Sequence, residues 1–250
     1  MTRGKAEPKM AIPKQGFVVA IDGPAGTGKS SVTRRLAEVL DFTHIDTGAL
    51  YRAVAYLLMK QGTNIEADPE EAVKLARSVH LEFKRQPKKN PANRIYADGK
   101  DLTDSIRTPE ISMSASRVSA IPGVRAALVG LQRRLGCVGR TILEGRDIGT
   151  VIFPDADIKF FLTASVDERA KRRLAELEAA GKDAPSFEDV KTQIADRDRA
   201  DSTRAIAPLK RAEEAVEVDT SEMTLDEVVH AMETRIRAQM GLTLRGKNKA

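Results

Sequence analysis

The sequence contains one cysteine, Cys137, among its 250 residues. A single cysteine cannot form an intramolecular disulfide, and this suits the reducing conditions of the cytoplasm. The chain also lacks an apolar run of about 18 residues, the length that a membrane-spanning helix needs. Its first 16 residues are basic and lack the apolar segment of a secretory signal peptide. We therefore expect a cytoplasmic protein with no membrane partner.

Histidine is scarce as well, with only three in the chain. His44, His80 and His230 are far apart in the sequence, and none has a neighbour of the kind that a covalent intermediate or a metal site needs. We therefore expect neither a phosphohistidine intermediate nor a metal held by histidine.

Most of the chain also lacks an excess of either charge, although its formal net charge is +5. Residues 1–16 carry +3 and residues 241–250 carry another +3, which leaves residues 17–240 at −1. The two tails are rich in Gly, Lys and Pro, a composition typical of disordered ends. We expect both tails to be disordered and no nucleic acid to be required. Contact of the tails with RNA or an acidic partner is the alternative.

The most informative segment that is present is a phosphate-binding loop. The apolar, β-branched run Phe17–Asp22 leads directly into Gly-Pro-Ala-Gly-Thr-Gly-Lys-Ser at 23–30, which matches G-x-x-x-x-G-K-[ST] at every fixed position. Apolar residues at helical spacing follow the loop, namely Val32, Leu36, Val39 and Leu40. Strand, loop and helix together place backbone N–H groups around a phosphate chain. The motif predicts binding of a nucleoside triphosphate; the alternative is a glycine-rich turn that binds nothing.

Each residue type in this loop has a task. Glycine lets the backbone approach the anion with positive φ angles. Lys29 can reach the β- and γ-phosphates, and the Ser30 hydroxyl can coordinate Mg²⁺, the expected metal cofactor. The residues expected to bind the donor nucleotide are Gly23, Pro24, Ala25, Gly26, Thr27, Gly28, Lys29, Ser30 and Ser31.

Segments with the patterns of strands and helices alternate along the chain. Strands are expected at 17–22, 42–45, 141–143, 158–162 and 215–218, with helices between them. This alternation predicts an α/β fold, a three-layer α/β/α arrangement around a central parallel sheet of five strands. Residues 64–115 differ, because a short helix there precedes alternating segments and an Asp98-Gly99 turn signal. We expect a small β-containing insertion in that range.

Two S/T-x-x-E capping boxes predict where later helices begin. They are formed by Ser165 with Glu168 and by Thr224 with Glu227. Gly181 is expected to end the first of these helices.

A phosphate loop predicts a bound nucleotide but does not identify the molecule that would accept its phosphoryl group. Three later stretches narrow the range of possible acceptors, because each is expected where the carboxyl end of a strand opens on the ligand crevice. Each also combines carboxylates with arginine, which can bind phosphate through two hydrogen bonds. They are Asp-Thr-Gly-Ala-Leu-Tyr-Arg at 46–52, Glu-Gly-Arg-Asp-Ile-Gly-Thr at 144–150 and Arg-Asp-Arg-Ala-Asp-Ser-Thr-Arg at 197–204. Plainer alternatives are a helix N-cap with an exposed arginine, a buried structural ion pair and a solvent-exposed helix face, respectively.

With these stretches in place, the chain resembles the bacterial-type cytidylate kinases of the nucleoside monophosphate kinase family. The resemblance covers residues 17–240. It is carried by Ile-Asp-Gly-Pro-Ala-Gly at 21–26, Asp-Thr-Gly-Ala-Leu-Tyr-Arg at 46–52, Gly-Arg-Asp-Ile-Gly-Thr-Val-Ile-Phe-Pro-Asp-Ala at 145–156 and Ser-Thr-Arg-Ala-Ile-Ala-Pro-Leu at 202–209. Departures are small: Thr27 and Ser31 stand where Ala and Thr are common in the family, and the basic tails are longer.

The resemblance implies transfer of the γ-phosphoryl group of ATP to CMP or dCMP, with Mg²⁺ and without a phosphoenzyme. It implies that Arg52, Arg146 and Arg204 hold the acceptor phosphate. Arg197 and Asp201 would contact the sugar. The residues that the resemblance implies for catalysis are Lys29, Arg146, Arg197 and Arg204.

The resemblance likewise implies a base-reading group. Ser116, Arg125 and Asp147 would read the cytosine, with Asp147 accepting a hydrogen bond from the exocyclic amine. The full set expected to bind the acceptor is Asp46, Thr47, Arg52, Ser116, Arg125, Arg146, Asp147, Arg197, Asp201 and Arg204.

A division of the chain follows from the same resemblance. It would consist of a kinase core at 17–63 and 116–240, a monophosphate-binding insertion at 64–115, a lid at about 182–211 within the core, and tails at 1–16 and 241–250. Closure of the lid would exclude water, which otherwise would accept the phosphoryl group. We expect a monomer whose substrates are ATP and CMP or dCMP.

Two other functions stay open on the sequence. One is a kinase with the same loop that acts on another nucleoside monophosphate or small acceptor. The other is a nucleic-acid-dependent NTPase or a GTP switch protein. The N-K-x-D motif with which GTPases read guanine is absent, and the one weak candidate for a Walker B acid is Glu144, after Leu143.

Overall fold

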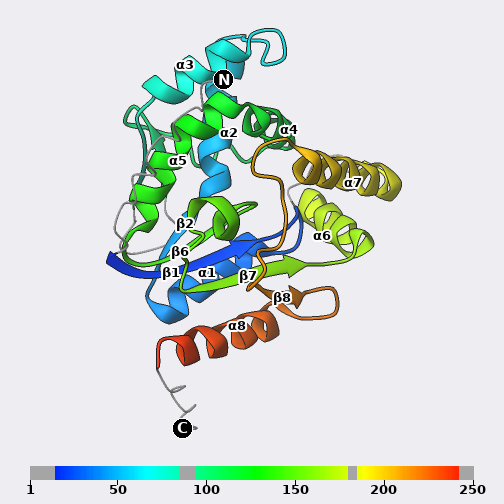
Figure 1. Ribbon diagram of the computed structural model, residues 1–250. Coiled ribbons are helices and arrows are strands. Elements are labelled where there is room, and N and C mark those ends of the chain that lie inside the picture. Colours follow the sequence, from blue (N-terminus) through cyan, green and yellow to red (C-terminus); the bar gives the residue numbers. More distant parts are fainter. Residues whose placement is uncertain (1–14, 85–93, 180–184, 242–250) are drawn as a thin grey trace, which may run out of the picture.

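The computed structural model describes residues 15–84, 94–179 and 185–241 (Figure 1). In chain order the elements are β1 (Gln15–Asp22), α1 (Lys29–Leu40), β2 (Thr43–Asp46), α2 (Thr47–Lys60), α3 (Pro69–Ser78), β3 (Leu81–Lys84), β4 (Arg94–Ala97), β5 (Lys100–Asp101), α4 (Pro109–Ala120), α5 (Pro122–Gly136), β6 (Val138–Gly145), the π-helical turn η1 (Ile148–Ile152), β7 (Ile158–Thr163), α6 (Val166–Ala179), α7 (Phe187–Thr203), β8 (Val216–Asp219) and α8 (Leu225–Gln239). Within the described ranges, no helix is long and apolar enough to cross a membrane.

A five-stranded parallel sheet in the order β2-β6-β1-β7-β8 forms the centre of the fold. β1 lies in the middle, and all residues of its segment Val18–Ile21 have an exposed fraction of 0%. A parallel strand that is covered on both faces needs such a continuous apolar run. The predicted α/β class and the five parallel strands are therefore confirmed. β6 is longer than the predicted strand at 141–143, because its first residues continue the pairing with β1 from Gln15 onward.

Helices cover both faces of the sheet, which gives the predicted three layers (Figure 1). On one face, Leu36 of α1 and Met232 of α8 pack with Phe160 of β7 in a fully buried cluster. On the other face, Leu143 of β6 packs with Ile152 of η1, and α5 lies over them. α1 and α8 thus form one outer layer, whereas α5 and η1 belong to the other.

Residues 64–115 contain the second, smaller sheet. β3, β4 and β5 are antiparallel and adjacent in that order. Asp98 and Gly99 join β4 to β5 with φ angles of 47° and 80°, as a two-residue hairpin turn with two positive φ angles requires. The expected β-containing segment and its turn are confirmed.

The apolar core does not follow the limits predicted for that segment. The largest buried cluster joins α2 and α5 to α3, α4, β3 and β4. The boundary predicted between residues 115 and 116 falls inside α4, because Ala115 and Val118 lie on one continuous buried face of that helix. The segment therefore shares its core with helices that we had placed outside it.

The predicted ends of the chain segments need one correction. β1 begins at Gln15, so the last two residues of the expected tail at 1–16 belong to the sheet, where they pair with Val138 and Gly139. The rest of that tail, residues 242–250 of the other tail and the helix end expected at Gly181 lie outside the described residues.

The two predicted capping boxes differ. At the start of α8, the Thr224 hydroxyl accepts from the Glu227 N–H, and the Glu227 carboxylate accepts from the Thr224 N–H. Before α6, the Ser165 hydroxyl accepts from the Glu168 N–H, but the Ser165 N–H donates to Ser221. The first box predicted along the chain is thus only half formed, because Glu168 pairs with Arg172.

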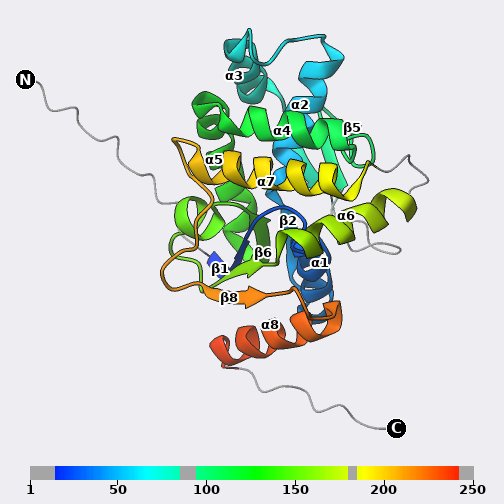
Figure 2. The same cartoon turned by 90° about the vertical axis from the view of Figure 1, so that its right-hand side faces the viewer.

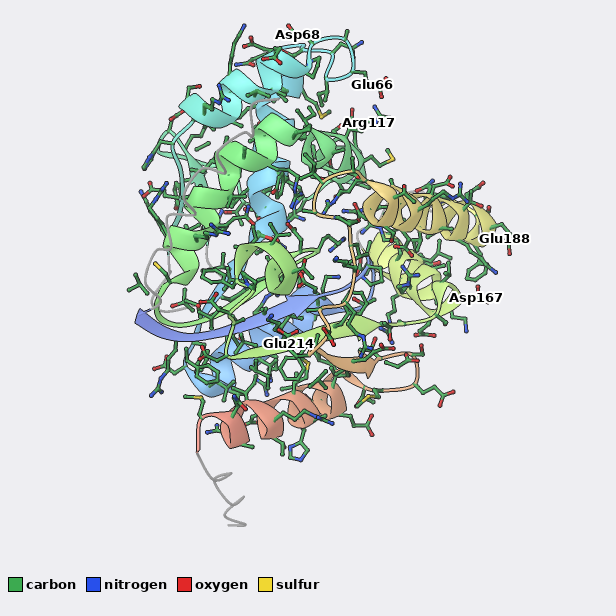
Figure 3. The ribbon with its side chains drawn as sticks, in the orientation of Figure 1. Glu66, Asp68, Arg117, Asp167, Glu188 and Glu214 are labelled. Carbon is green, nitrogen blue, oxygen red and sulfur yellow. The ribbon has the colours of Figure 1, made fainter. Side chains whose placement is uncertain are left out.

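α6 and α7 pack side by side and project from one side of the sheet (Figures 1 and 2). Asp167 of α6 and Glu188 of α7 lie on the same outer side of the molecule (Figure 3). Lys191 of α7 pairs with Asp167 at 2.7 Å between nitrogen and oxygen. α7 therefore lies within the range expected for the lid, whereas α6 precedes that range and packs against α7.

Candidate active site

The carboxyl ends of the strands bring acidic residues to one edge of the sheet. Asp22 ends β1 and Asp46 ends β2, and both lie beside the end of β6. Glu144, the residue before the last in β6, is in register with Asp46. Ligands of open parallel sheets bind outside this edge. The candidate site is built there.

The phosphate loop ends at a helix N-terminus that no side chain caps. Gly28 is the N-cap of α1, with φ 82°, and it has no side chain to accept from the first amides. α2, α3, α4, α7 and α8, in contrast, are each capped by an Asp, Ser or Thr side chain. The first amides of a helix attract anions. The predicted triphosphate site therefore has the backbone geometry that it needs.

Lys29 lies inside this loop and has only 6% of its surface exposed. Its Nζ donates to the Pro24 carbonyl and, at 3.2 Å, to the Thr27 hydroxyl. Burial lowers the pKa of Lys29 well below its usual value, and the charge of Arg146 lowers it further. An anion placed beside Lys29 would favour its charged form.

Gly23 and Gly28 give a matched test of the loop geometry. A Cβ on Gly23, at φ 148°, would lie 2.2 Å from the Leu162 carbonyl oxygen, whereas a Cβ on Gly28, at φ 82°, would meet nothing within 4 Å. We expect Gly23→Ala to lower the free energy of unfolding by about 3 kcal/mol or more. Gly28→Ala should cost only the left-handed strain of about 1–2 kcal/mol. Denaturant unfolding of both variants measures the difference, and equal losses would contradict the close approach.

A chain of hydrogen bonds connects the loop to β6 and β2. The Ser30 hydroxyl donates to Glu144 Oε2 at 2.7 Å, and Glu144 Oε1 lies 2.8 Å from His44 Nε2. Glu144 and His44 are both buried. The sequence gives Glu144 a place in the stretch at 144–150 and as a weak Walker B candidate, and it predicts no role for His44. The signal for Glu144 was an acid at the end of a buried strand, as expected for a residue near a metal-bound phosphate.

Asp46 and Arg52 form a pair at the start of α2. Asp46 Oδ1 accepts from the Ala49 N–H at 3.1 Å, so Asp46 is the N-cap, and Oδ2 accepts from Arg52 Nη2 at 2.5 Å. Burial raises the pKa of Asp46, but the charge of Arg52 outweighs it and holds the pKa below its usual value. The helix thus begins at Thr47, directly after its capping aspartate. The Thr47 hydroxyl donates to the Glu144 carbonyl at 2.7 Å.

Asp147 lies between two arginines. Its Oδ2 accepts from Arg125 Nη2, and its Oδ1 lies 3.6 Å from Arg204 Nη2. The Arg125 guanidinium also lies over the Tyr51 ring, 5.5 Å from its centroid, and donates to the Ser119 carbonyl. Asp147 and Arg125 are 4% and 3% exposed. The structure therefore brings three residues from α5, the end of β6 and the end of α7 into one buried cluster.

Arg146 and Asp201 form the neighbouring contact. Arg146 Nε donates to Asp201 Oδ2 at 3.0 Å. Burial disfavours the charged form of Asp201, but the charges of Arg146 and Arg197 outweigh it and lower its pKa. The pKa of Arg197 is lowered to about 10, first by burial and then by the charge of Arg146. The predicted stretches at 144–150 and 197–204 thus meet across the site.

Three arginines of the site hold buried N–H groups that lack a hydrogen-bond partner in the described structure. They are Arg52 Nε, Arg197 Nε and Arg204 Nη2. Buried donors of this kind are rare in folded proteins and call for an explanation. Burial and then the charge of Arg125 lower the pKa of Arg204, so its surroundings disfavour the charged form of this arginine. An anion would satisfy the donors and the charges together.

Ser116 is less closely placed than the other predicted residues. It lies half-buried on α4, and its carbonyl accepts from the Ser119 hydroxyl at 2.8 Å. Among the contacts described for this part of the chain, none joins the Ser116 hydroxyl to Asp147 or Arg125. Its connection to the cluster passes through Ser119, whose carbonyl accepts from Arg125.

Arg169 of α6 is a residue that we did not predict. Its Nη1 donates to the Ala25 carbonyl at 3.1 Å and pairs with Asp198 of α7 at 2.7 Å. Only 4% of its surface is exposed, and its Cβ lies so close to the loop that a Cβ on Gly26 would be 3.0 Å away. Arg169 therefore connects the phosphate loop to both projecting helices.

The chain was compared with known protein families. The sequence model of the cytidylate kinase family matches residues 19–238. The chain belongs to the cytidylate kinase family. The resemblance seen in the sequence is thereby confirmed, and it covers nearly all of the chain between the tails.

Two curated relatives illustrate the match. The chain is 46% identical over 227 residues to a cytidylate kinase of Geobacter sulfurreducens, and the alignment covers 91% of this chain and 95% of the relative. It is 47% identical over 218 residues to a bifunctional pantoate ligase/cytidylate kinase of a Synechococcus species. That alignment covers 86% of this chain but only 40% of the bifunctional relative. The chain thus spans less than half the length of the bifunctional family member.

A solved structure supports the fold. The crystal structure of an uncharacterized protein from Eubacterium ventriosum is similar with a TM-score of 0.50 and 12% sequence identity. The similarity covers 89% of this chain and 98% of that protein. At this identity the likeness concerns the fold alone.

Asp22 belongs to the family motif at 21–26, but the sequence did not predict its contacts. It is 4% exposed, and its two carboxylate oxygens accept from the N–H groups of Ile148 at 2.9 Å and Gly149 at 2.8 Å. Burial raises the pKa of Asp22 from 3.8 to about 6, against the opposing effect of these two amides. Asp22 therefore titrates in a range where the stability of the fold can report on it.

We expect the stability of the chain to fall between pH 4 and pH 6 because of Asp22. The folded chain binds this proton more tightly than the unfolded chain, so raising the pH removes up to about 3 kcal/mol of unfolding free energy, at about 1.4 kcal/mol per pH unit. Denaturant unfolding at several pH values should show this trend relative to Asp22→Asn, which cannot ionise. A stability difference between the two proteins that does not change with pH would contradict the assignment.

Proposed function

We propose that this chain transfers the γ-phosphoryl group of ATP to CMP or dCMP and releases ADP with CDP or dCDP. Membership of the cytidylate kinase family supports the reaction. The observation that carries it is a pair of neighbouring anion-binding features: an uncapped helix N-terminus with Lys29, and buried arginines with unsatisfied donors, of which Arg197 lies near enough to lower the pKa of Lys29. A kinase needs two anionic phosphates held against each other, so catalysis rests on positioning and charge neutralisation.

On the donor side, the loop at 23–30 would hold the triphosphate through its backbone amides. The charges of Arg146 and Arg197 both lower the pKa of Lys29, so these arginines lie near its ammonium group. Lys29 is therefore the residue that would accompany the transferred group. Its present acceptors, the Pro24 carbonyl and the Thr27 hydroxyl, would be exchanged for phosphate oxygens.

The residues around Ser30 fit a magnesium ion. Ser30 and Glu144 offer hard oxygen ligands 2.7 Å apart beside the loop. The described residues contain no group of three or more His, Cys, Asp or Glu that could hold a metal by themselves. Mg²⁺ commonly binds through one or two protein oxygens together with phosphates and water. When bound with ATP it would neutralise phosphate charge, with Ser30 as its protein ligand and Glu144 orienting that hydroxyl.

On the acceptor side, Arg52, Arg146 and Arg204 would hold the phosphate. The unsatisfied N–H groups of Arg52 and Arg204 and the lowered pKa of Arg204 support this role. The pairs with Asp46 and Asp147 keep two of the guanidinium groups oriented before the substrate arrives.

The base and the sugar would contact the remaining acidic residues. Asp147 would accept from the cytosine amine, with Arg125 and Ser116 completing the reading of the base. Asp201 and Arg197 would contact the sugar. The family resemblance supplies these assignments, and the clustering of Asp147 with Arg125 supports the first of them.

The segment at about 182–211, which contains α7 and of which 182–184 lie outside the described residues, would act as the lid. Arg197 and Asp201 are on α7, so movement of this helix would carry substrate-binding groups with it. Arg169 and Asp198 would couple that movement to the phosphate loop. Residues 64–115 would form the monophosphate-binding insertion, and the core would be the remainder of 17–240. The reaction would take place in the cytoplasm, on a monomer.

An acceptor panel tests this function. The whole chain with ATP and Mg²⁺ is supplied in turn with CMP, dCMP, UMP, AMP, GMP, single-stranded RNA or no acceptor, and ADP release is measured. We expect the highest kcat/KM with CMP or dCMP and little ADP release with RNA or without acceptor. A preference for another monophosphate would indicate a different kinase. RNA-dependent ADP release would indicate an NTPase and would overturn the proposal.

A further inference from the structure

The π-helical turn η1 directly follows the residues that the proposed function gives to the acceptor. The Ile152 N–H donates to the Asp147 carbonyl at 3.2 Å, and the Phe153 N–H donates to the Ile148 carbonyl at 2.7 Å. A single turn leaves its first amides and last carbonyls without partners inside the turn. Turns of this type are rare and occur frequently at functional sites. η1 therefore needs support from outside its own residues.

Asp22 supports the beginning of the turn. Its two carboxylate oxygens accept from the first two amides, those of Ile148 and Gly149. The backbone approaches closely at this point, because a Cβ on Gly149 would lie 3.0 Å from the Lys159 side chain and 3.5 Å from Asp22 Oδ2. Each of the two oxygens is thus matched to one amide that the turn itself cannot satisfy.

Arg133 of α5 supports the end of the turn. Its Nε donates to the Ile152 carbonyl at 3.1 Å, and its Nη2 donates to the Val151 carbonyl at 3.0 Å. α5 is also in tight contact with the next residue, since a Cβ on Gly136 would lie 2.5 Å from the Phe153 ring. The last two carbonyls of the turn are thereby satisfied by one charged side chain on a long helix.

We propose that Asp22 and Arg133 are positioning residues that hold η1 at its two ends and so fix Asp147 for the acceptor base. Asp147 precedes the turn, and its carbonyl accepts from both Val151 and Ile152. A shift of the turn therefore moves the Asp147 backbone. Because the Asp147 carboxylate pairs with Arg125 and Arg204, these two side chains would move as well. Small displacements of this kind can cost about 100-fold in rate. This role rests on the proposed function, because it concerns the recognition of its acceptor.

Arg133 gives the cleaner test, because Asp22 also affects Lys29 electrostatically. Arg133→Met keeps most of the side-chain volume and removes both donors. We expect it to raise the KM for CMP about tenfold and to reduce the preference for CMP over UMP, with the KM for ATP changed less than about twofold. Arg133→Lys, which keeps one charged donor, should recover part of the preference. The exposed neighbour Arg134 provides the control, and Arg134→Met should behave as the unchanged chain does.

The role of Asp22 is tested with a single variant and with a double variant that also changes Arg133. Asp22→Asn should reduce the CMP preference in the same direction, and the double variant with Arg133→Met should lose little more than the larger single loss, because both act on one turn. Thermal unfolding of each variant shows that it is folded at the assay temperature. If the unchanged chain fails to phosphorylate CMP, the proposed function fails. If it succeeds but Arg133→Met and Asp22→Asn leave the CMP/UMP ratio unchanged, or raise the KM values for ATP and CMP equally, the positioning role is overturned.

Discussion

Replacing Lys29 with methionine is expected to lower kcat for CMP phosphorylation by about 100- to 1,000-fold while the chain remains folded. Transfer of a phosphoryl group between two anions depends mainly on preorganised positive charge, and loss of one such donor commonly costs about 100- to 1,000-fold. Lys29 lies inside the phosphate loop, and the charges of Arg146 and Arg197 are near enough to lower its pKa. Methionine keeps the length of the stem and removes only the charged end.

The stability of this variant separates a catalytic loss from a folding defect. Burial already lowers the pKa of Lys29, so removing its ammonium group relieves a cost and should not lower the free energy of unfolding. Lys60→Met, at the exposed end of α2, is a matched control that should keep full activity. Steady-state kinetics and denaturant unfolding of both variants give the comparison. Normal turnover by a folded Lys29→Met variant would contradict the mechanism.

Replacing Asp147 is expected to affect both base selectivity and stability. Asp147→Asn keeps the shape of the side chain but removes the carboxylate that would accept from cytosine. A site built to hydrogen-bond a substrate group loses much of its selectivity when its polar groups are mismatched. We expect the ratio of kcat/KM for CMP over UMP to fall by at least about tenfold, at about 1.4 kcal/mol per factor of ten, with little change in the KM for ATP.

Stability measurements test the same cluster independently. Asp147→Ala leaves Arg125 buried without its carboxylate, and breaking a buried pair in this way typically costs about 3–5 kcal/mol. Adding Arg125→Met removes the uncompensated charge, so the double variant should regain part of that loss. The exposed Asp196 on α7 provides the control, and Asp196→Asn should change neither selectivity nor stability. A CMP/UMP ratio that is unchanged in Asp147→Asn would refute the base-reading role.

The parts of the fold that were predictable depend on local patterns. The continuous apolar run of β1 and the glycines that follow it are enough to place the phosphate loop, and Asp98-Gly99 is enough to place a hairpin turn. The first turn of α2 shows the limit of this reasoning. Asp46 caps the helix, as the plainer alternative held, but it also pairs with Arg52, which is therefore not an exposed arginine.

The contacts that complete the site could not be predicted, because they join residues that are far apart in the chain. Ser30 and Glu144 are 114 residues apart, and Asp22 and Gly149 are 127 apart. No periodicity marks such pairs. A π-helical turn of five residues, as at η1, also has too few residues to show a pattern.

The limits of the segment at 64–115 were hard to predict for a related reason. Composition and turn signals change there, but the apolar face of α4 runs across the expected boundary at 115. Burial of that face depends on α2 and α5, which lie on either side of the segment in the sequence. Tertiary packing, rather than a break in the chain, therefore decides which helices belong together.

The most direct test of the central claim follows the phosphoryl group itself. ATP labelled in its γ-phosphate is incubated with the whole chain, Mg²⁺ and CMP, and the labelled products are separated. We predict that the label appears in the β-phosphate of CDP, that its appearance needs CMP, and that it disappears in Lys29→Met. Label released as inorganic phosphate at a rate independent of CMP would contradict the account.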